Sequence, residues 1–436
     1  MPFSDLDSAA VARALSQIAD RPGDLADLFL ERREEIELPP PSSTPGFRVW
    51  RESGLAVRLL RGGRSWLAGR DGLGRESFHD ALRSAARAMP RAPYPEPELA
   101  ERGWEAPAAP EVLGFPSTLE RRLRALSADL PLRLTVRRHR RWVRLVGTQL
   151  ASGLERESFY SLRAETPAGV SGFLFAELGD GAAERVARSL VRAHQAREAP
   201  TPEPRARVAV LGFAATAVLL HEAVAHALEA DTLALKGDPE SALGDRLGSA
   251  ELNVFDDPQT APESVRRSAD DEGYPVVRRC LLRAGAVEQP LCDTAWAQRS
   301  EALTAGAGRR GNRHLPPGPR STHLELAAGE LSSRELLADA GDGLYLPEAE
   351  RGRLDPLSGE FTLRFPYGLR IEDGMPGATV GPCSLRGPIR EILGSVAAVG
   401  REVRSAGAGW CAKGGVKLPV WATAAELRLE GVEIRP

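Results

Sequence analysis

The sequence is poor in the features that mark secreted and membrane-spanning proteins. Its 436 residues include four cysteines and no C-x-x-C pair, which argues against a disulfide-built scaffold and for free thiols in a reducing compartment. The longest apolar run, residues 208–220, is too short to span a bilayer and predicts a buried strand that leads into a buried helix. The first residues lack the basic and apolar regions of a secretory signal. We therefore expect a soluble protein of the cytoplasm with no membrane partner.

An excess of charge of one sign is also missing. The net charge is −3, so no overall field attracts the chain to nucleic acid or to a membrane surface. Lysine occurs only at Lys236, Lys413 and Lys417, and arginine supplies nearly all of the basic charge. The dense basic stretch 133–144 is interpreted as a solvated hairpin, because Trp142 is its only aromatic residue. Nucleic-acid binding is the weaker alternative.

The length and the placement of proline predict two domains. A chain of 436 residues is too long for one small core, and the polar, proline-dense segment 198–204 marks the boundary. We expect an N-terminal α/β domain, residues 1–197, with an antiparallel sheet and helices. A β-rich C-terminal domain, residues 205–436, would carry a metal-binding helix. The expected fold class is therefore α+β.

Alternating apolar residues and turn residues predict individual strands. Residues 54–60 and 65–68 are expected to form a hairpin around an Arg-Gly-Gly-Arg turn. Near the C-terminus, residues 416–422 and 426–434 are expected to be terminal strands. The glycine-flanked segment 409–415 is predicted to be the loop that precedes them.

The most informative motif is His221-Glu222-Ala223-Val224-Ala225-His226. Neutral imidazoles are common zinc ligands, and a carboxylate beside a metal-bound water is a ready general base. The familiar hydrolase spacing of four residues places both histidines on one side of a helix. The spacing here is five, which turns the second ring about 140° away from the first on a regular helix. Both rings reach one metal only if the helix carries a wide turn, such as a π-bulge.

A hydrolytic zinc site also needs a third protein ligand and an open position for water. Cys411 is the leading candidate, because its glycine-flanked segment allows close approach, and Lys413 is placed to hold a neighbouring thiolate. The alternative for Cys411 is a half-buried free thiol. Glu229, three residues after His226, is a candidate for orienting that imidazole; the alternative is a structural helix carboxylate.

The motif and several later segments together resemble a known family. The run 221–231 is similar to the H-E-x-x-x-H signature of the TldD/PmbA metalloproteases. Further short matches follow in the same order through most of the C-terminal half, and the hairpin at 54–68 resembles the family's N-terminal domain more weakly. The later matches are segments 314–316, 319–322, 343–345, 355–361, 371–374, 411–413 and 419–420.

The resemblance implies roles for four residues. His221, His226 and Cys411 would hold one zinc ion per catalytic subunit, and Glu222 would be the catalytic base that activates the metal-bound water. All four positions are filled, as in the catalytic, TldD-like type rather than in companion subunits that lack the metal set. The family commonly has glycine where this chain has Ala225 and Ala227, so the wide turn must form without glycine's freedom.

We therefore predict a zinc-dependent peptidase. By resemblance it would act on unfolded peptides inside the cavity of a homodimer, or of a heterodimer with a related subunit. Arg320 and His323 are further candidates for binding the peptide or its oxyanion. Two other interpretations stay open: a non-catalytic companion subunit with a structural zinc closed by a fourth ligand, and a peptide-maturation protease of a biosynthetic pathway.

Overall fold

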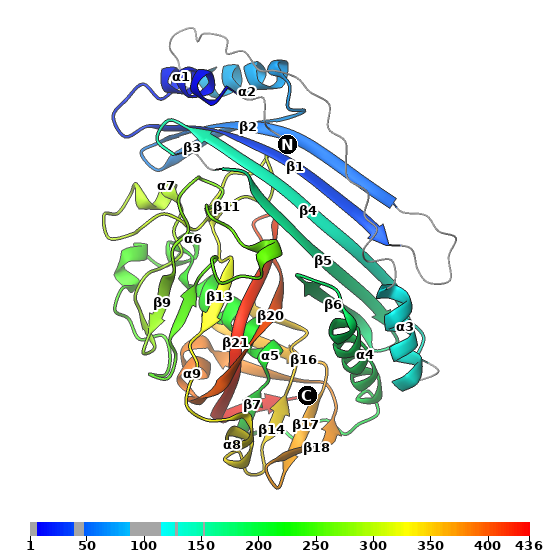
Figure 1. Cartoon of the computed structure of the whole chain (residues 1–436). Coiled ribbons are helices and arrows are strands. Elements are labelled where there is room, and N and C mark those ends of the chain that lie inside the picture. Colours follow the sequence, from blue (N-terminus) through cyan, green and yellow to red (C-terminus); the bar gives the residue numbers. More distant parts are fainter. Residues whose placement is uncertain (1–6, 39–47, 88–114, 127–129, 151–152) are drawn as a thin grey trace.

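The computed structural model describes residues 7–38, 48–87, 115–126, 130–150 and 153–436. Within these residues the strands form two large sheets with helices packed on them, which confirms the predicted α+β class (Figure 1). The two sheets share no strand. The last N-terminal helix ends at Gln195 and the first strand of the second sheet begins at Arg205. None of the helices in these residues is long and apolar enough to cross a bilayer.

The N-terminal sheet has six described strands in the order β3-β2-β1-β4-β5-β6, and every neighbouring pair is antiparallel. The predicted hairpin at 54–68 is confirmed as part of β2 and β3. The N-terminal elements are α1 (Ser8–Ile18), β1 (Leu25–Leu38), β2 (Arg48–Arg61), β3 (Arg64–Asp71), α2 (Arg75–Arg87), α3 (Phe115–Leu126), β4 (Arg133–Gly147), β5 (Glu155–Thr166), β6 (Gly169–Phe175) and α4 (Asp180–Gln195).

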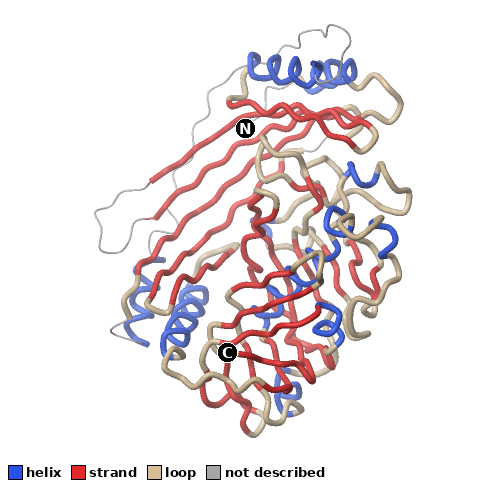
Figure 2. Tube along the Cα trace, turned by 180° about the vertical axis from the view of Figure 1, so that it is seen from behind, coloured by secondary structure: helices blue, strands red, loops and turns tan. Residues whose placement is uncertain are grey.

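Alternation along β1 gives the N-terminal sheet two different faces. Leu28, Leu30 and Ile36 point to the outer face, where α1 and α2 cover one end and α3 and α4 cover the other. Asp27 and Glu31 point to the inner face, toward the C-terminal sheet. Figure 2 shows this layering from behind, with the helices outside and the second sheet inside. The helices therefore leave the inner face free for the rest of the chain.

The C-terminal sheet is built around β7 and the long β20–β21 hairpin. Strand β21 pairs with β7, β13, β19 and β20, so it ties most of this region together. The larger elements are β7 (Arg205–Leu211), α5 (Phe213–Leu219), β13 (His323–Leu326), β14 (Leu344–Leu346), β15 (Arg351–Leu354), β16 (Glu360–Phe365), β17 (Gly368–Glu372), β18 (Met375–Val380), β19 (Cys383–Pro388), α8 (Ser333–Ala338), α9 (Ile389–Gly394), β20 (Val396–Lys413) and β21 (Val416–Arg435).

Shorter elements fill the irregular region between the motif and residue 320. They are η1 (Leu220–Ala225), η2 (His226–Leu228), α6 (Ala230–Leu233), η3 (Pro239–Ala242), β8 (Val254–Asp256), η4 (Glu263–Val265), β9 (Arg279–Arg283), β10 (Ala286–Val287), α7 (Thr294–Ala297), β11 (Gly308–Arg309) and β12 (Gly318–Pro319).

The terminal strands predicted at 416–422 and 426–434 are confirmed, and they form one continuous strand, β21, because its backbone keeps pairing with β20 through residues 423–425. Another prediction near the C-terminus is wrong. Segment 409–415 is not a loop, since Cys411 lies within β20 and pairs with Leu418. The glycines have other tasks: a register shift falls between Gly407 and Gly409, and the chain turns at 414–415, where both glycines have positive φ.

Buried ion pairs join the inner face of the N-terminal sheet to the C-terminal half. Arg58 of β2 bonds Asp27 at 2.6 Å and also pairs with Glu272. Arg141 of β4 bonds Glu31 at 2.8 Å and lies 3.3 Å from Asp271. All of these side chains are almost fully buried. We call this set of buried ion pairs the charged joint. It fixes how the N-terminal sheet and the C-terminal half align, because each buried charge needs its own partner.

The position of the basic stretch 133–144 in the N-terminal sheet shows that its interpretation as a solvated hairpin is wrong. These residues form β4 in the interior of the sheet, between β1 and β5, rather than a solvated hairpin. Several of its arginines pair with the acidic residues of β1, for example Arg137 with Glu37 at 3.0 Å and Arg140 with Glu34 at 3.3 Å. Its positive charge is thus largely compensated within the sheet.

We predict that Arg141→Met strongly destabilises the protein. The substitution leaves Glu31 and Asp271 buried without this cation, a change that typically costs about 3–5 kcal/mol. Thermal and urea unfolding of the full chain measure the loss. Arg188→Met is the matched control: its partner Glu184 lies on the same exposed helix face, and such pairs contribute about 0.5 kcal/mol or less. Equal effects of the two substitutions would contradict a stabilising role for the joint.

Candidate metal centre

The motif lies on a helix that changes from α to π winding at Leu220, just before the first histidine. The α-helix α5 runs directly into the π-helix η1, which is followed by the 3-10 turn η2. The backbone N–H of His226 donates to the carbonyl of His221, five residues earlier. A π turn places residues five apart on the same side, and the two imidazole centroids are 4.5 Å apart. The wide turn predicted from the five-residue spacing is therefore confirmed, and it forms with alanine at positions 225 and 227.

Cys411 approaches the two rings from strand β20. Its Sγ lies 3.6 Å from Nε2 of His226. One possible ligand atom from each of His221, His226 and Cys411 can be chosen so that all three lie within 4.8 Å of one another. Among the described residues these three form the one such group of metal-binding side chains. The structure thus brings together the three residues that the sequence singled out, although they come from distant parts of the chain.

His221 has the properties of a neutral ligand. Its side chain is buried, and neither ring nitrogen has a hydrogen-bond partner. Burial, with a smaller contribution from the neighbouring His226, lowers the pKa of His221 to about 3. A buried imidazole with two unsatisfied nitrogens is costly unless something else binds it. A metal ion satisfies that need, because the neutral ring is the form that coordinates.

His226 is held from behind by Glu229. Its Nδ1 lies 3.0 Å from the Glu229 carboxylate, which leaves Nε2 directed toward Cys411. Burial alone would lower the pKa of His226, but the charge of Glu229 and the contact with Cys411 outweigh it and raise the pKa to about 10. The surroundings therefore favour a positive charge at this position. A bound metal cation would be favoured by the same groups.

Two cations hold Glu229 in turn. Lys413 donates to Glu229 at 2.6 Å and to Asp231 at 2.8 Å, and Arg320 lies 3.6 Å from Glu229. Burial would raise the pKa of the Glu229 carboxyl, but His226, Arg320 and Lys413 together lower it. Lys413 therefore contacts the carboxylate behind the histidine, whereas the sequence suggested a contact with the thiolate. Asp231, which also bonds Arg320 at 3.1 Å, was not singled out from the sequence.

Glu222 faces a cavity beside the ligands. The cavity has a volume of about 420 Å³, and Glu222, His226, Trp410 and Lys413 are among the residues that line it. Burial raises the pKa of Glu222 to about 7, which makes this carboxyl able to exchange a proton near neutral pH. Of the three candidate ligands, His226 is the one that lines this cavity.

Gly352 of β15 packs directly against Glu222. A Cβ at this position would lie 2.5 Å from Cγ and 2.9 Å from Cβ of Glu222. A larger residue would therefore push the carboxylate or the strand aside. Sequence reasoning missed Gly352, because the local pattern around it gives no sign of a contact with a segment so distant in the chain.

The structure places His323 away from the cavity. It is fully buried in β13, and its Nε2 contacts the hydroxyl of Thr423 at 3.0 Å. Arg320 also does not line the cavity, since its guanidinium is engaged with Glu229 and Asp231. Neither side chain is positioned to contact a peptide beside Glu222.

The donor set fits a zinc ion. Two imidazole nitrogens and one thiolate sulfur are typical zinc ligands, and three protein ligands beside a cavity are typical of a catalytic rather than a closed structural site. The unsatisfied nitrogens of His221 supply the structural observation that a cation belongs here.

Comparison with known proteins agrees with this arrangement. Residues 206–435, just over half of the chain, match the model of the PmbA/TldA metallopeptidase C-terminal domain. A metalloprotease of Methanothermobacter thermautotrophicus is 32% identical over 250 residues, which cover 56% of this chain and 52% of that protein. A metalloprotease TldD homolog of Haemophilus influenzae is 29% identical over 231 residues, which cover 52% and 47%. The chain thus spans about half the length of the curated relatives it matches.

The fold as a whole also has a solved counterpart. The crystal structure of TldE from Thermococcus kodakarensis superposes with a TM-score of 0.72 and covers 98% of this chain and 99% of its own, at 17% sequence identity. That likeness shows the fold, including the N-terminal sheet that the family model does not reach. With the family model covering the metal centre and most of the C-terminal sheet, the chain belongs to the TldD/PmbA family.

Proposed function

We propose that this protein is a zinc-dependent peptidase with Glu222 as its general base. His221, His226 and Cys411 would hold one zinc ion per chain. The observation that carries the proposal is the convergence of these three ligands beside a partly buried carboxylate that lines a cavity. The names of the relatives, metalloprotease and metalloprotease TldD homolog, support the same reaction class.

The chain's own residues suit proton transfer during peptide hydrolysis. A zinc ion in this set supplies Lewis acidity toward a peptide carbonyl and toward water. The Glu222 carboxylate would accept a proton from water and return it to the departing amine, a task suited to a pKa near 7. Glu229, held by Lys413, would keep the His226 ring in its ligating orientation.

We further propose that the substrate is an unfolded peptide and that the active assembly is a homodimer or a heterodimer with a related subunit. A cavity of about 420 Å³ beside Glu222 supports the first part of this proposal, and the TldE among the structural relatives supports the second. Four free cysteines support a reducing compartment such as the cytoplasm. A companion subunit with a structural zinc is less well supported, because among the described residues the metal-binding group has three protein ligands.

We predict that Glu222→Gln abolishes peptide cleavage without removing the metal. The amide keeps the size of the side chain but cannot accept the proton, so turnover should fall by at least about 100-fold. Cleavage of an unstructured fluorogenic peptide and metal analysis of the purified protein measure the two effects. Substitution of the exposed Glu301 by glutamine is the control and should change neither. Retained turnover in Glu222→Gln would eliminate Glu222 as the base.

Zinc content should depend on one of the four thiols. Cys411→Ser replaces a thiolate by a much poorer zinc ligand, so we expect substoichiometric zinc and activity that is lost to mild chelators. Cys280→Ser is the matched control, because Cys280 is also a free, buried thiol but lies in strand β9. Zinc affinity that is the same in both variants would show that Cys411 is not a ligand.

Gly352→Ala tests whether peptide cleavage depends on the position of the Glu222 side chain. The added methyl group overlaps the Glu222 side chain, so the variant should bind zinc normally yet cleave peptides at least about tenfold more slowly. Gly394→Ala is the control, since a Cβ there meets nothing within 4 Å. Full activity of Gly352→Ala, with the protein folded, would contradict the close packing of β15 on the base.

A further inference from the structure

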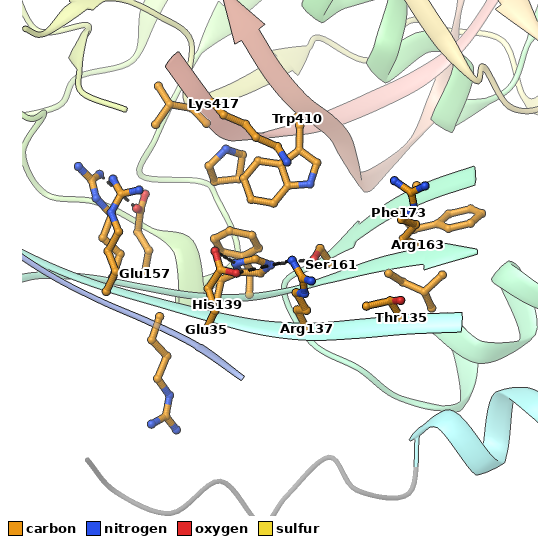
Figure 3. A pocket seen from close by; sticks show the side chains of 18 of the residues that line it. Glu35, Thr135, Arg137, His139, Glu157, Ser161, Arg163, Phe173, Trp410 and Lys417 are labelled. Atoms are coloured by element: carbon orange, nitrogen blue, oxygen red, sulfur yellow. Dashed lines mark hydrogen bonds and ion pairs between the residues drawn. The ribbon is translucent and has the colours of Figure 1, made fainter. Parts of the chain in front are cut away.

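A second cavity lies next to the metal centre, between the N-terminal sheet and the β20–β21 hairpin. We call this space the sheet cleft; it has a volume of about 660 Å³. Its floor is the inner face of β1, β4, β5 and β6, with Glu35, His139 and Ser161, and its roof carries Trp410 and Lys417 (Figure 3). The site described above uses none of these side chains as a ligand or base.

Trp410 connects the sheet cleft to the metal cavity. Its indole lines both spaces, one residue before the ligand Cys411. The ring meets His139 and Phe159 edge to face, with centroids 5.4 and 5.5 Å away. The two cavities are therefore neighbours on either side of one aromatic wall. The sheet cleft is therefore one of the spaces that adjoin the cavity beside Glu222.

On the floor of the sheet cleft, His139 and Glu35 hold the Ser161 hydroxyl in place. His139 stacks on Phe159 and contacts Ser161 Oγ through Nε2 at 2.7 Å and Glu35 through Nδ1 at 3.4 Å. The contact with His139 lowers the pKa of Glu35, and the charges of Arg137 and Lys417 lower it further. Nδ1 faces Glu35 and Nε2 faces Ser161 Oγ; in the neutral tautomer that carries its proton on Nδ1, Nε2 accepts a hydrogen bond from the Ser161 hydroxyl. The Ser161 oxygen keeps its lone pairs for an N–H group in the cleft.

A serine, a histidine and a carboxylate in this order also occur in hydrolases that use the serine as a nucleophile. The strand geometry around Ser161 favours binding of a ligand over nucleophilic catalysis. Strand β5 is paired with β4 on one side and with β6 on the other across Ser161, so its backbone N–H groups serve the ladder. They are not available to stabilise an oxyanion.

Six cationic residues and three carboxylates line the sheet cleft. The five arginines among the cationic residues each pair with a carboxylate of the N-terminal sheet. Each of the three carboxylates contacts an arginine or histidine of the sheet: Glu34 with Arg140, Glu35 with His139 and Glu157 with Arg141. Lys417 is different. Its Nζ lies 4.5 Å from the centroid of the Trp410 ring, and within the described part of the chain it has no ion pair or hydrogen bond.

We propose that the sheet cleft is a substrate subsite that binds a carboxylate-bearing segment of the peptide. Lys417 pairs with the carboxylate, and Trp410 and Phe159 contact the apolar atoms of the same segment. The carboxylate is either an acidic side chain or the free carboxyl end of the peptide. The proposal rests on the proposed peptidase function for the identity of its ligand, but binding in the cleft does not require turnover.

Equilibrium binding to the full-length, zinc-loaded Glu222→Gln protein tests the subsite without cleavage. The probes are fluorescent unstructured peptides in two pairs: one pair differs by glutamate or glutamine inside the sequence, the other by a free or an amidated C-terminus. In at least one pair the acidic peptide should bind about fivefold more tightly, the effect of one partly exposed ion pair. The pair that shows the preference identifies the source of the carboxylate.

Substitution of Lys417 decides whether the preference arises in the sheet cleft. Lys417→Met should abolish it while leaving the amide peptide's affinity within twofold, and Lys236→Met, at another exposed lysine, should preserve it. An unchanged preference in Lys417→Met, or no preference in either pair, would overturn the proposal. Turnover that survives Glu222→Gln but is lost in Ser161→Ala would also overturn it, by making the serine a nucleophile. A subsite preference without cleavage by the parent protein would refute only the peptidase function.

Discussion

One widened helical turn determines the geometry of the metal centre. The hydrogen bond from His226 N–H to the His221 carbonyl spans five residues and puts both imidazoles on one side of the helix. On a regular α-helix the second ring would point about 140° away from the first, and no rotation of the helix as a whole would change that angle. The π turn is thus the feature on which the ligand set, and with it the proposed chemistry, depends.

The third ligand comes from the strand that also forms the roof of the sheet cleft. Strand β20 carries Trp410 and Cys411 in succession, and its hairpin partner β21 ties it to the core of the C-terminal sheet. Trp421 of β21 packs on Phe159 of the N-terminal sheet, and the buried ion pairs of Arg58 and Arg141 fix the same two halves. The metal cavity and the sheet cleft therefore keep their relative positions because one hairpin and one charged joint belong to both.

The sequence was informative where one local rule decides the outcome. The five-residue spacing in the motif required a wide turn, and alternation in 54–68 predicted the hairpin. The sequence misled at the glycines that flank Cys411, because glycine is common both in loops and in the bulges and turns of strands. These glycines indicated a loop, but they form a bulge and a hairpin turn at the two ends of a strand segment. Contacts between distant segments carried no local signal. Gly352 against Glu222, and Lys413 against Glu229, depend on packing that only the folded chain defines.

X-ray absorption at the zinc K-edge of the purified full-length protein tests the central claim most directly. The account predicts a first shell with two nitrogen scatterers at about 2.0 Å, one sulfur scatterer at about 2.3 Å and one further light atom. A shell without sulfur, or one with two or more sulfurs, would contradict the convergence of His221, His226 and Cys411 on a single ion.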